Sequence, residues 1–268
     1  CVNMKNSIVC FIITLIFTLG ACSSDDILEK NDIAPSAVTT STFKDGFVCI
    51  DMEPKNKSGM TTYGALQTEY KWNTGQTITI KFLNGDSYLQ EKVKQYANIW
   101  LDFANLKFEY VNPDEDANIR ISFDGSNNYW SLLGTDCLQY DQSFATMNFG
   151  GFDQYTPENE FSRLILHEFG HALGLIHEHQ SPASDIQWNK PAVYEYYMGP
   201  PTYWDAAKVE SAIFDKLSET LTNYTSFDQY SIMLYSFPSE FTLDGWSSGW
   251  NEVLSYNDVQ FIGEQYPF

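Results

Sequence analysis

The chain has 268 residues, of which 43% are hydrophobic and 19% charged, so it holds enough apolar material for one large core or two lobes. Lys and Arg number 15 and Asp and Glu 35, which gives a formal net charge of −20. A surface this acidic repels phosphate backbones and anionic lipid headgroups, which argues against nucleic-acid binding and electrostatic membrane attachment. All four histidines lie between residues 167 and 179, so the search for chemistry centres there.

The N-terminal part has the features of an export signal. An apolar run, residues 8–19, follows Lys5, and it is shorter than the roughly twenty apolar residues that span a bilayer. Its length is that of a signal-peptide core. We therefore expect residues 1–21 to be a signal peptide and the chain to be exported.

The residues at the end of this signal, Leu-Gly-Ala-Cys at 19–22, resemble the lipobox of bacterial lipoproteins, where cleavage leaves the cysteine as a lipid-carrying N-terminus. The Ser-Ser-Asp-Asp sequence that follows resembles the tag that sends some lipoproteins to the outer face of the outer membrane. The resemblance predicts a lipid on Cys22 as the one membrane attachment, with the protein on the outer membrane and exposed at the cell surface. A plain secretory cleavage after Ala21 is the alternative.

The rest of the chain divides into a tether and a folded domain. Residues 22–62 are rich in Ser, Thr, Asp, Asn, Lys and Pro, which predicts a lipidated tether or a pro-segment, with an inhibitory strand near residues 43–50. Dense aromatic patterning predicts one folded domain over 63–268. Within it, apolar spacing predicts a helix over 88–103 and strands over 77–82, 106–111, 117–123, 129–133 and 144–149.

A second, longer helix is predicted to start at Thr156, which suits the N-cap position and precedes a proline, and to end at Gly174. It carries the sequence His-Glu-Phe-Gly-His-Ala-Leu-Gly-Leu-Ile-His, from His167 to His177, which fits H-E-x-x-H-x-x-G-x-x-H. His179 lies outside this spacing, and we expect it at the surface or beside the site.

The spacing of this motif suits one tetrahedral Zn²⁺ ion. His167 and His171 are one helical turn apart, so their imidazoles project from one face, and Gly174 permits the left-handed turn that brings His177 to a third corner. The fourth position is left for water, whose pKa falls to about 7 on zinc so that it becomes a nucleophile at neutral pH. Glu168 lies next to the metal without ligating it and is the expected general base.

A further pattern, Ser-Ile-Met-Leu-Tyr at 231–235, places Met233 two residues before Tyr235. Together with the run from His167 to Gln180, it resembles the metzincin zinc peptidases and the astacin family in particular. The resemblance extends over residues 70–268. It implies that Met233 forms an apolar floor below the histidines, that Tyr235 stabilises the oxyanion, and that Glu178 forms a buried salt bridge near the mature N-terminus.

Three features depart from the animal astacins. Leu234 stands where those proteins usually have His, and their paired cysteines are absent. Phe-Lys-Asp-Gly at 43–46 is a rearranged form of their inhibitory Phe-x-Gly-Asp. The disulfide framework of the family therefore does not transfer to this chain, and its mode of latency does not follow from the resemblance.

The resemblance implies an α+β metzincin fold: a five-stranded twisted mixed sheet with two long helices in an upper lobe, and an irregular lower lobe with a C-terminal helix. It implies a monomeric endopeptidase with one catalytic Zn²⁺ that binds extended protein or peptide substrates antiparallel to the edge strand at 129–133. Glu168 would pass the proton of the attacking water to the leaving amine, while Zn²⁺ polarises the carbonyl and Tyr235 stabilises the tetrahedral intermediate.

Two alternatives to an astacin-like endopeptidase stay open. One is an enzyme of another metzincin group. The other is a surface-binding or adhesion lipoprotein that keeps the scaffold without turnover, although such a protein has no use for a general base such as Glu168.

Cys49 lies in the tether and is, in our interpretation, a candidate fourth ligand of the zinc ion. Its thiolate, or the carboxylate of Asp45 or Asp51, would fill the open zinc position and keep the enzyme latent. Two other possibilities stay open, a disulfide between Cys49 and Cys137 and a buried free thiol.

Overall fold

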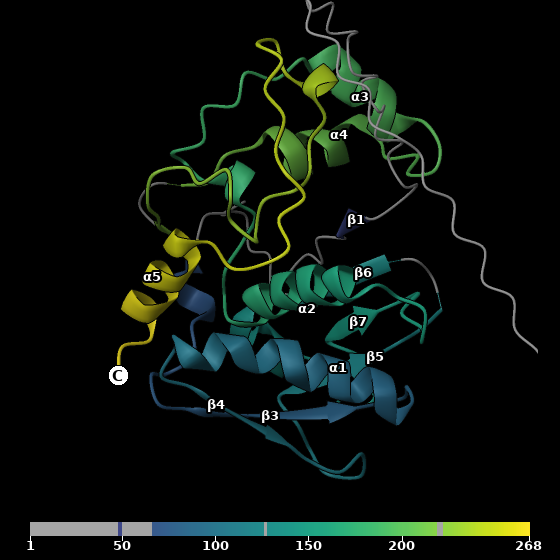
Figure 1. Cartoon of the computed structure of the whole chain (residues 1–268), viewed down its shortest axis with the longest axis vertical. Coiled ribbons are helices and arrows are strands. Elements are labelled where there is room, and N and C mark those ends of the chain that lie inside the picture. The colour runs from purple at the N-terminus through teal and green to yellow at the C-terminus, as the bar shows by residue number, and fades with distance from the viewer. Residues whose placement is uncertain (1–47, 50–65, 126–127, 219–221) are drawn as a thin grey trace, which may run out of the picture. The chain divides into compact units, whose positions relative to one another are not determined.

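The computed structural model describes residues 48–49, 66–125, 128–218 and 222–268 (Figure 1). All of them belong to one compact unit that begins at Lys44. The predicted signal peptide, Cys22, Asp45 and Asp51 lie outside the described residues. Within the described ranges, no helix is both long enough and apolar enough to cross a membrane.

The upper lobe is built on a mixed sheet with strand order β1-β6-β7-β5-β3-β4, in which only β6 and β7 pair antiparallel. Its strands are β1 (Val48–Cys49), β3 (Thr77–Phe82), β4 (Lys107–Tyr110), β5 (Ile119–Ser122), β6 (Asn128–Ser131) and β7 (Met147–Phe149). The five strands from β3 to β7 confirm the predicted five-stranded mixed sheet.

The sixth strand, β1, comes from the segment that precedes the domain. It pairs in parallel with β6, and Cys49 lies opposite Tyr129. The prediction that β6 forms the edge of the sheet is therefore wrong for the chain as it stands, because β1 occupies that edge.

A second, two-stranded sheet joins the start of the domain to the lower lobe. Its strands, β2 (Leu66–Gln67) and β8 (Thr222–Asn223), pair antiparallel. Leu66 also forms an isolated bridge with Leu175, just after the second long helix. The chain therefore enters the domain beside the residues that lead to His177.

Two long helices, α1 (Ser87–Ala97) and α2 (Glu158–Ala172), lie side by side in the upper lobe, which is drawn in the lower half of Figure 1. The helix predicted over 88–103 is shorter, because the chain tightens into a 3₁₀ helix (Asn98–Asp102) after α1. The predicted N-cap of α2, Thr156, is wrong by one position, and Pro157 takes that place. The Thr156 hydroxyl instead exchanges hydrogen bonds with Asp153 in the preceding turn.

The lower lobe contains more helix than we expected. It holds α3 (Lys190–Met198), α4 (Ala206–Val209), a π-helical turn (Glu210–Phe214) and the predicted C-terminal helix α5 (Tyr256–Gln265). A capping box starts α5: the Ser255 hydroxyl accepts from the Asp258 N–H, and the Asp258 carboxylate accepts from the Ser255 N–H.

The described residues form two hydrophobic clusters. The main core joins the sheet, α1, α2 and α5, and it includes Met233. The second cluster lies in the lower lobe and consists of Val193, Tyr197, Val209, Ala212, Ile213, Leu234, Phe237 and Phe241. The two clusters therefore meet between consecutive residues, Met233 and Leu234.

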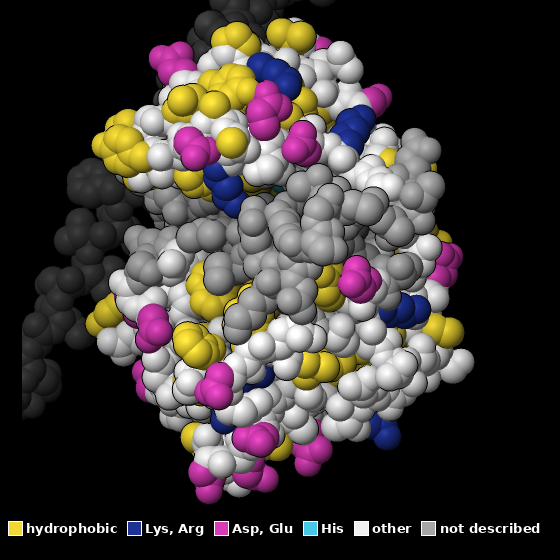
Figure 2. Space-filling model, turned by 180° about the vertical axis from the view of Figure 1, so that it is seen from behind, with side chains coloured by type: hydrophobic (Ala, Val, Ile, Leu, Met, Phe, Trp, Pro, Cys, Tyr) yellow, Lys and Arg dark blue, Asp and Glu magenta, His cyan; other side chains and the backbone are white. Residues whose placement is uncertain are grey.

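The distribution of charged side chains on the surface agrees with the acidic net charge of the chain. On the face shown in Figure 2, acidic side chains are scattered over the molecule, and Lys and Arg form no continuous patch among its described residues.

Candidate active site

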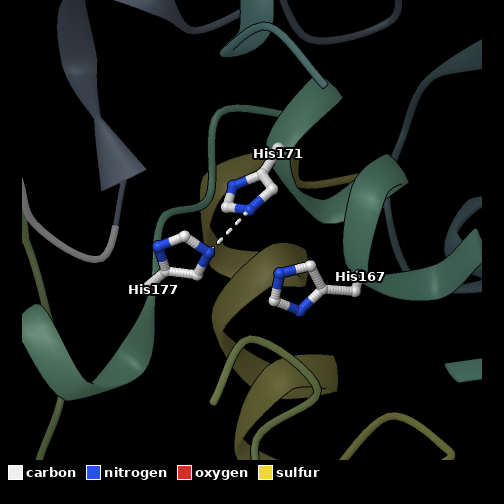
Figure 3. Close-up of side chains that lie close together, drawn as sticks. All are labelled: His167, His171 and His177. Atoms are coloured by element: carbon white, nitrogen blue, oxygen red, sulfur yellow. Dashed lines mark hydrogen bonds between the residues drawn. The ribbon is translucent and has the colours of Figure 1, made fainter. Parts of the chain in front are cut away.

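The three histidines of the motif converge, as the sequence predicts. His167 and His171 project from α2, and His177 approaches from the chain that follows the helix (Figure 3). Their ligand nitrogens all lie within 4.8 Å of one another, and the three residues are buried. The Nε2 atoms of His171 and His177 are 3.1 Å apart, close to the separation of about 3.3 Å between two nitrogens of a tetrahedral zinc site.

The end of α2 explains how His177 reaches its position. The helix stops at Ala172, and Gly174 adopts a φ of +95°, a left-handed conformation that favours glycine. The N–H of Leu175 then donates to the carbonyl of Gly170 at 2.9 Å, so the chain turns back along the helix. The predicted role of Gly174 matches this geometry.

The donor atoms fit a metal ion that prefers nitrogen ligands. The Nδ1–H of His167 donates to the Ile232 carbonyl at 2.8 Å, so the lone pair of its Nε2 faces the other two histidines. This Nε2 is buried without a hydrogen-bond partner among the described residues. Burial holds the pKa of the His167 imidazole well below its usual range, and the neighbouring His171 and His177 lower it further. Three buried imidazoles are a typical catalytic zinc donor set.

Glu168 follows the first ligand on α2, and its side chain is 0% exposed. A carboxylate is seldom buried so completely without a function or strong partners. Glu168 therefore stays the predicted general base.

Met233 packs directly below the helix that carries the ligands. A Cβ atom added at Gly170 would lie 2.3 Å from the Met233 sulfur, so only glycine leaves room for this contact. Met233 is therefore close enough to α2 to form the predicted floor. Gly170 could not be singled out from the sequence, because it occupies a variable position of the motif and gives no signal of its own.

Tyr235 lies beside the histidines. Its ring centroid is 4.2 Å from that of His177 and 6.1 Å from that of His167. On its other side it contacts His179, at 4.8 Å between ring centroids. These positions allow the phenol to serve the same site as the ligands.

His179 is not at the surface, so that part of its prediction is wrong. The residue is 1% exposed and its Nε2–H donates to the carbonyl of Ala212 at 3.0 Å. Its ring stacks beside His177 and packs edge-on against Phe237. His179 therefore ties the ligand segment to the aromatic second cluster, which accounts for its burial.

Glu178 is directed into a small cavity that Asp228 and Asp258 also line. Its Oε1 accepts the backbone N–H of Asp228 at 2.8 Å. Burial raises the pKa of the Glu178 carboxyl to about 8, and the carboxylates of Asp258 and Asp228 add to the rise. Within the described residues, no Lys or Arg forms an ion pair with Glu178.

The disulfide between Cys49 and Cys137 is not formed, which removes one of the possibilities that the sequence left open. Cys137 is a free, buried cysteine. Burial raises the pKa of its thiol to about 12, so it is protonated at neutral pH. Its environment is that of an inert core thiol.

Comparisons with known proteins agree with this fold and with a zinc site. No known family profile matches the chain. Two structures of myroilysin resemble it: one is 45% identical with a TM-score of 0.74, covering 76% of this chain and 99% of its own; the other is 41% identical with a TM-score of 0.63, covering 85% and 94%.

More distant proteins resemble parts of the molecule. Serralysin B from Dickeya chrysanthemi is 31% identical over 150 residues, which are 52% of this chain and 30% of serralysin B. The match therefore spans less than a third of that protein. The hatching enzyme and zinc-protease HCE-1 from Oryzias latipes shares 18% identity with a TM-score of 0.51, covering 77% of this chain and 98% of its own, and this likeness concerns the fold alone.

Proposed function

The chain belongs to the metzincin zinc metalloendopeptidases, in the family that includes myroilysin and the astacins, and we propose how its residues divide the work of peptide hydrolysis. The observation that carries the proposal is the buried cluster of His167, His171 and His177 with Glu168 next to it on the same helix. Together these residues provide three ligands and a base.

The three imidazoles would hold one Zn²⁺ ion. When bound, the ion would polarise the scissile carbonyl and lower the pKa of a water molecule to about 7. Glu168 would accept the proton of this water and deliver it to the leaving amine. The phenol of Tyr235 would donate a hydrogen bond to the oxyanion that develops on the former carbonyl oxygen.

Strand β6 offers the backbone groups that an extended substrate needs. The Asn128 carbonyl accepts from Gly150, and the Leu132 N–H donates to Thr146, so these residues face β7. Alternate residues of a strand face opposite edges, and the N–H and C=O groups of Tyr129 and Ser131 therefore point to the other edge. We propose that a peptide substrate pairs with Tyr129 and Ser131 in antiparallel orientation once β1 has left.

The position of β1 supports a latent state of the chain. It occupies the edge where the substrate would bind, and its parallel direction is opposite to the one proposed for a substrate. We propose that this segment blocks the cleft until it is removed, with Cys49, Asp45 or Asp51 as the residue that would ligate the zinc. The segment would otherwise be a spacer between a lipid and the enzyme.

Removal of the segment would also produce a positively charged partner for Glu178, which forms no ion pair with Lys or Arg among the described residues. Leu66 forms a bridge with Leu175, which lines the cavity of Glu178, Asp228 and Asp258. The amino group of a new N-terminus would place a positive charge among these carboxyls. We propose that Glu178 forms its salt bridge with this group.

The lipobox sequence and the acidic residues after it support export, a lipid on Cys22 and a place on the outer membrane, which we keep as part of the proposal. Incorporation of labelled fatty acid into the wild-type chain and its loss in Cys22→Ala would test the lipid. Labelling that is equal in both proteins would contradict it.

One experiment tests the enzyme and its latency together. Zinc content and casein cleavage, with and without a zinc chelator, should be measured for the whole chain and for a form that begins at Thr62. We expect the short form to bind one zinc per chain and to cleave casein in a chelator-sensitive manner. The whole chain should be nearly inactive, and one of the substitutions Cys49→Ser, Asp45→Ala or Asp51→Ala should make it active.

His171→Ala and His179→Gln form a matched pair for this test. Both remove a buried imidazole, but only His171 is a ligand, so zinc should be lost from the first variant alone. A chain that stays metal-free in the presence of zinc would contradict the zinc-enzyme proposal. Zinc binding with no cleavage by either form would favour the adhesion alternative, and equal cleavage by both forms would leave the segment as a spacer.

A further inference from the structure

A chain of hydrogen bonds leads from the ligand His167 to a carboxylate on helix α5. The Nδ1–H of His167 donates to the Ile232 carbonyl at 2.8 Å. The N–H of the same peptide group, that of Met233, donates to the Ser231 hydroxyl at 3.0 Å. This hydroxyl lies 2.7 Å from Oδ1 of Asp258. We call these three bonds the His167–Asp258 relay.

The direction of every bond in the relay is fixed. A carbonyl only accepts, so His167 donates to Ile232, and a backbone N–H only donates, so the Ser231 oxygen accepts from Met233. The single hydrogen of the Ser231 hydroxyl is then left for Asp258. All three donors therefore point toward the carboxylate, and hydrogen bonds aligned in this way polarise one another.

Asp258 is held firmly at the end of the relay. Its Oδ2 accepts the N–H groups of Ile232 and Ser255, both at 2.8 Å. Asp258 and Ser231 are both buried, so water does not compete with these bonds. Both atoms of the carboxylate thus bind the turn that carries Met233, and Asp258 connects this turn to the first turn of α5.

The second ligand on α2 is oriented by a different contact. The Nδ1–H of His171 donates to the carbonyl of Leu175 at 2.9 Å, in the turn that ends its own helix. This contact orients the ring through a neutral backbone carbonyl. The two ligands on α2 therefore differ in the carbonyl that accepts their Nδ1–H: that of Ile232, which belongs to the relay, or that of Leu175.

We propose that Ser231 and Asp258 are positioning residues for His167, which fix its Nδ1–H tautomer and strengthen its Nε2 as a zinc ligand through the relay. The inference rests on the proposed zinc site. Partners of this kind behind a ligating histidine typically change metal affinity by about 10- to 100-fold. The serine of the Ser-Ile-Met-Leu-Tyr sequence thereby acquires a role apart from the turn itself.

The test is the zinc dissociation constant of the whole chain, measured by competition with a chelator, for wild type, Ser231→Ala and Asp258→Asn. We expect both variants to bind zinc about 10- to 100-fold more weakly than wild type. Asp258→Asn keeps the size of the side chain and one acceptor oxygen, so it remains informative if Ser231→Ala folds poorly.

Ser255→Ala is the matched control. It removes the hydroxyl that caps α5 and binds Asp228, but it leaves each bond of the relay in place. Thermal unfolding of the metal-free proteins will show whether the control is destabilised as much as the relay variants. We expect its zinc affinity to stay near that of wild type.

The outcomes separate the relay from the zinc site. Unchanged zinc affinity in folded Ser231→Ala and Asp258→Asn would overturn the relay while the proposed function stands. An equal loss in Ser255→Ala would also overturn it, because the effect would then follow stability. A wild-type chain that binds no zinc would overturn the proposed function and the relay with it.

Discussion

Helix α2 presents His167, Glu168 and His171 through its own backbone hydrogen bonds, whereas His177, Met233 and Tyr235 stand on irregular chain that side chains hold in place. On the helix, the spacing of residues alone sets which groups share a face. In the lower lobe, the Met233 turn depends on Ser231, Asn251 and Asp258, which bond to its backbone. One half of the site is thus organised locally, and the other by residues distant in sequence.

Substitutions in the two halves of the site should therefore have different effects. A change on α2 removes a chemical group and leaves the helix standing, because the helix does not depend on that side chain. A change behind the Met233 turn moves several groups at once. Substitutions in each half of the site test this contrast.

Glu168→Gln should abolish most of the turnover while leaving zinc and fold intact. The substitution removes the general base but no ligand, and such a base contributes about 10²- to 10⁴-fold to the rate. We would measure kcat and zinc content together, with Glu160→Gln on the same helix as the control that keeps both. Near-normal proteolysis by Glu168→Gln would contradict the assigned mechanism.

Tyr235→Phe should reduce kcat by about 10²- to 10³-fold, the effect of one oxyanion donor. Its zinc content should stay that of wild type, because the three histidines do not depend on the phenol. Tyr194→Phe, in the aromatic surroundings of the second cluster, is the control that loses a hydroxyl away from the site. A fully active Tyr235→Phe would make Tyr235 a packing residue only.

Gly170→Ala should destabilise the protein by about 1–3 kcal/mol, because the added methyl group collides with the Met233 sulfur where the two halves of the site meet. The measurement is the free energy of unfolding of Gly170→Ala, Met233→Ala and the double variant. Since Met233→Ala makes room for the methyl group, the double variant should lose less stability than the sum of the two. If the losses in free energy of unfolding of the two single variants add up to that of the double variant, residues 170 and 233 do not interact sterically.

Much of the upper lobe could be predicted from the sequence, because its signals are local. Alternation marked the strands, and the spacing from His167 to His177 marked a helix, a left-handed turn and three ligands. Small errors arose where two local interactions compete. Thr156 is a good N-cap in isolation, but Asp153 binds its hydroxyl and the helix begins one residue later.

The lower lobe was harder to predict because its contacts join distant segments. Helix α3 packs on residues 209–241, and no local pattern shows which of its aromatic residues turn inward. No partner for His179 could be predicted from the sequence, because the Ala212 carbonyl that it binds lies 33 residues away in the chain. Asp258 lies 27 residues from Ser231 in sequence, so only the fold reveals that it stands behind a ligand.

The meeting of the two hydrophobic clusters between Met233 and Leu234 has a consequence for motion. Segments with separate cores open with separate free energies, and the smaller core opens more readily. Opening of the second cluster would carry Leu234 and Tyr235 away from the histidines, while Met233 and α2 stay in the main core. We expect such a state to keep most of the amide protection of the main core against hydrogen exchange while Tyr235 lies away from the histidines, so that activity would fall at a lower temperature than the fold.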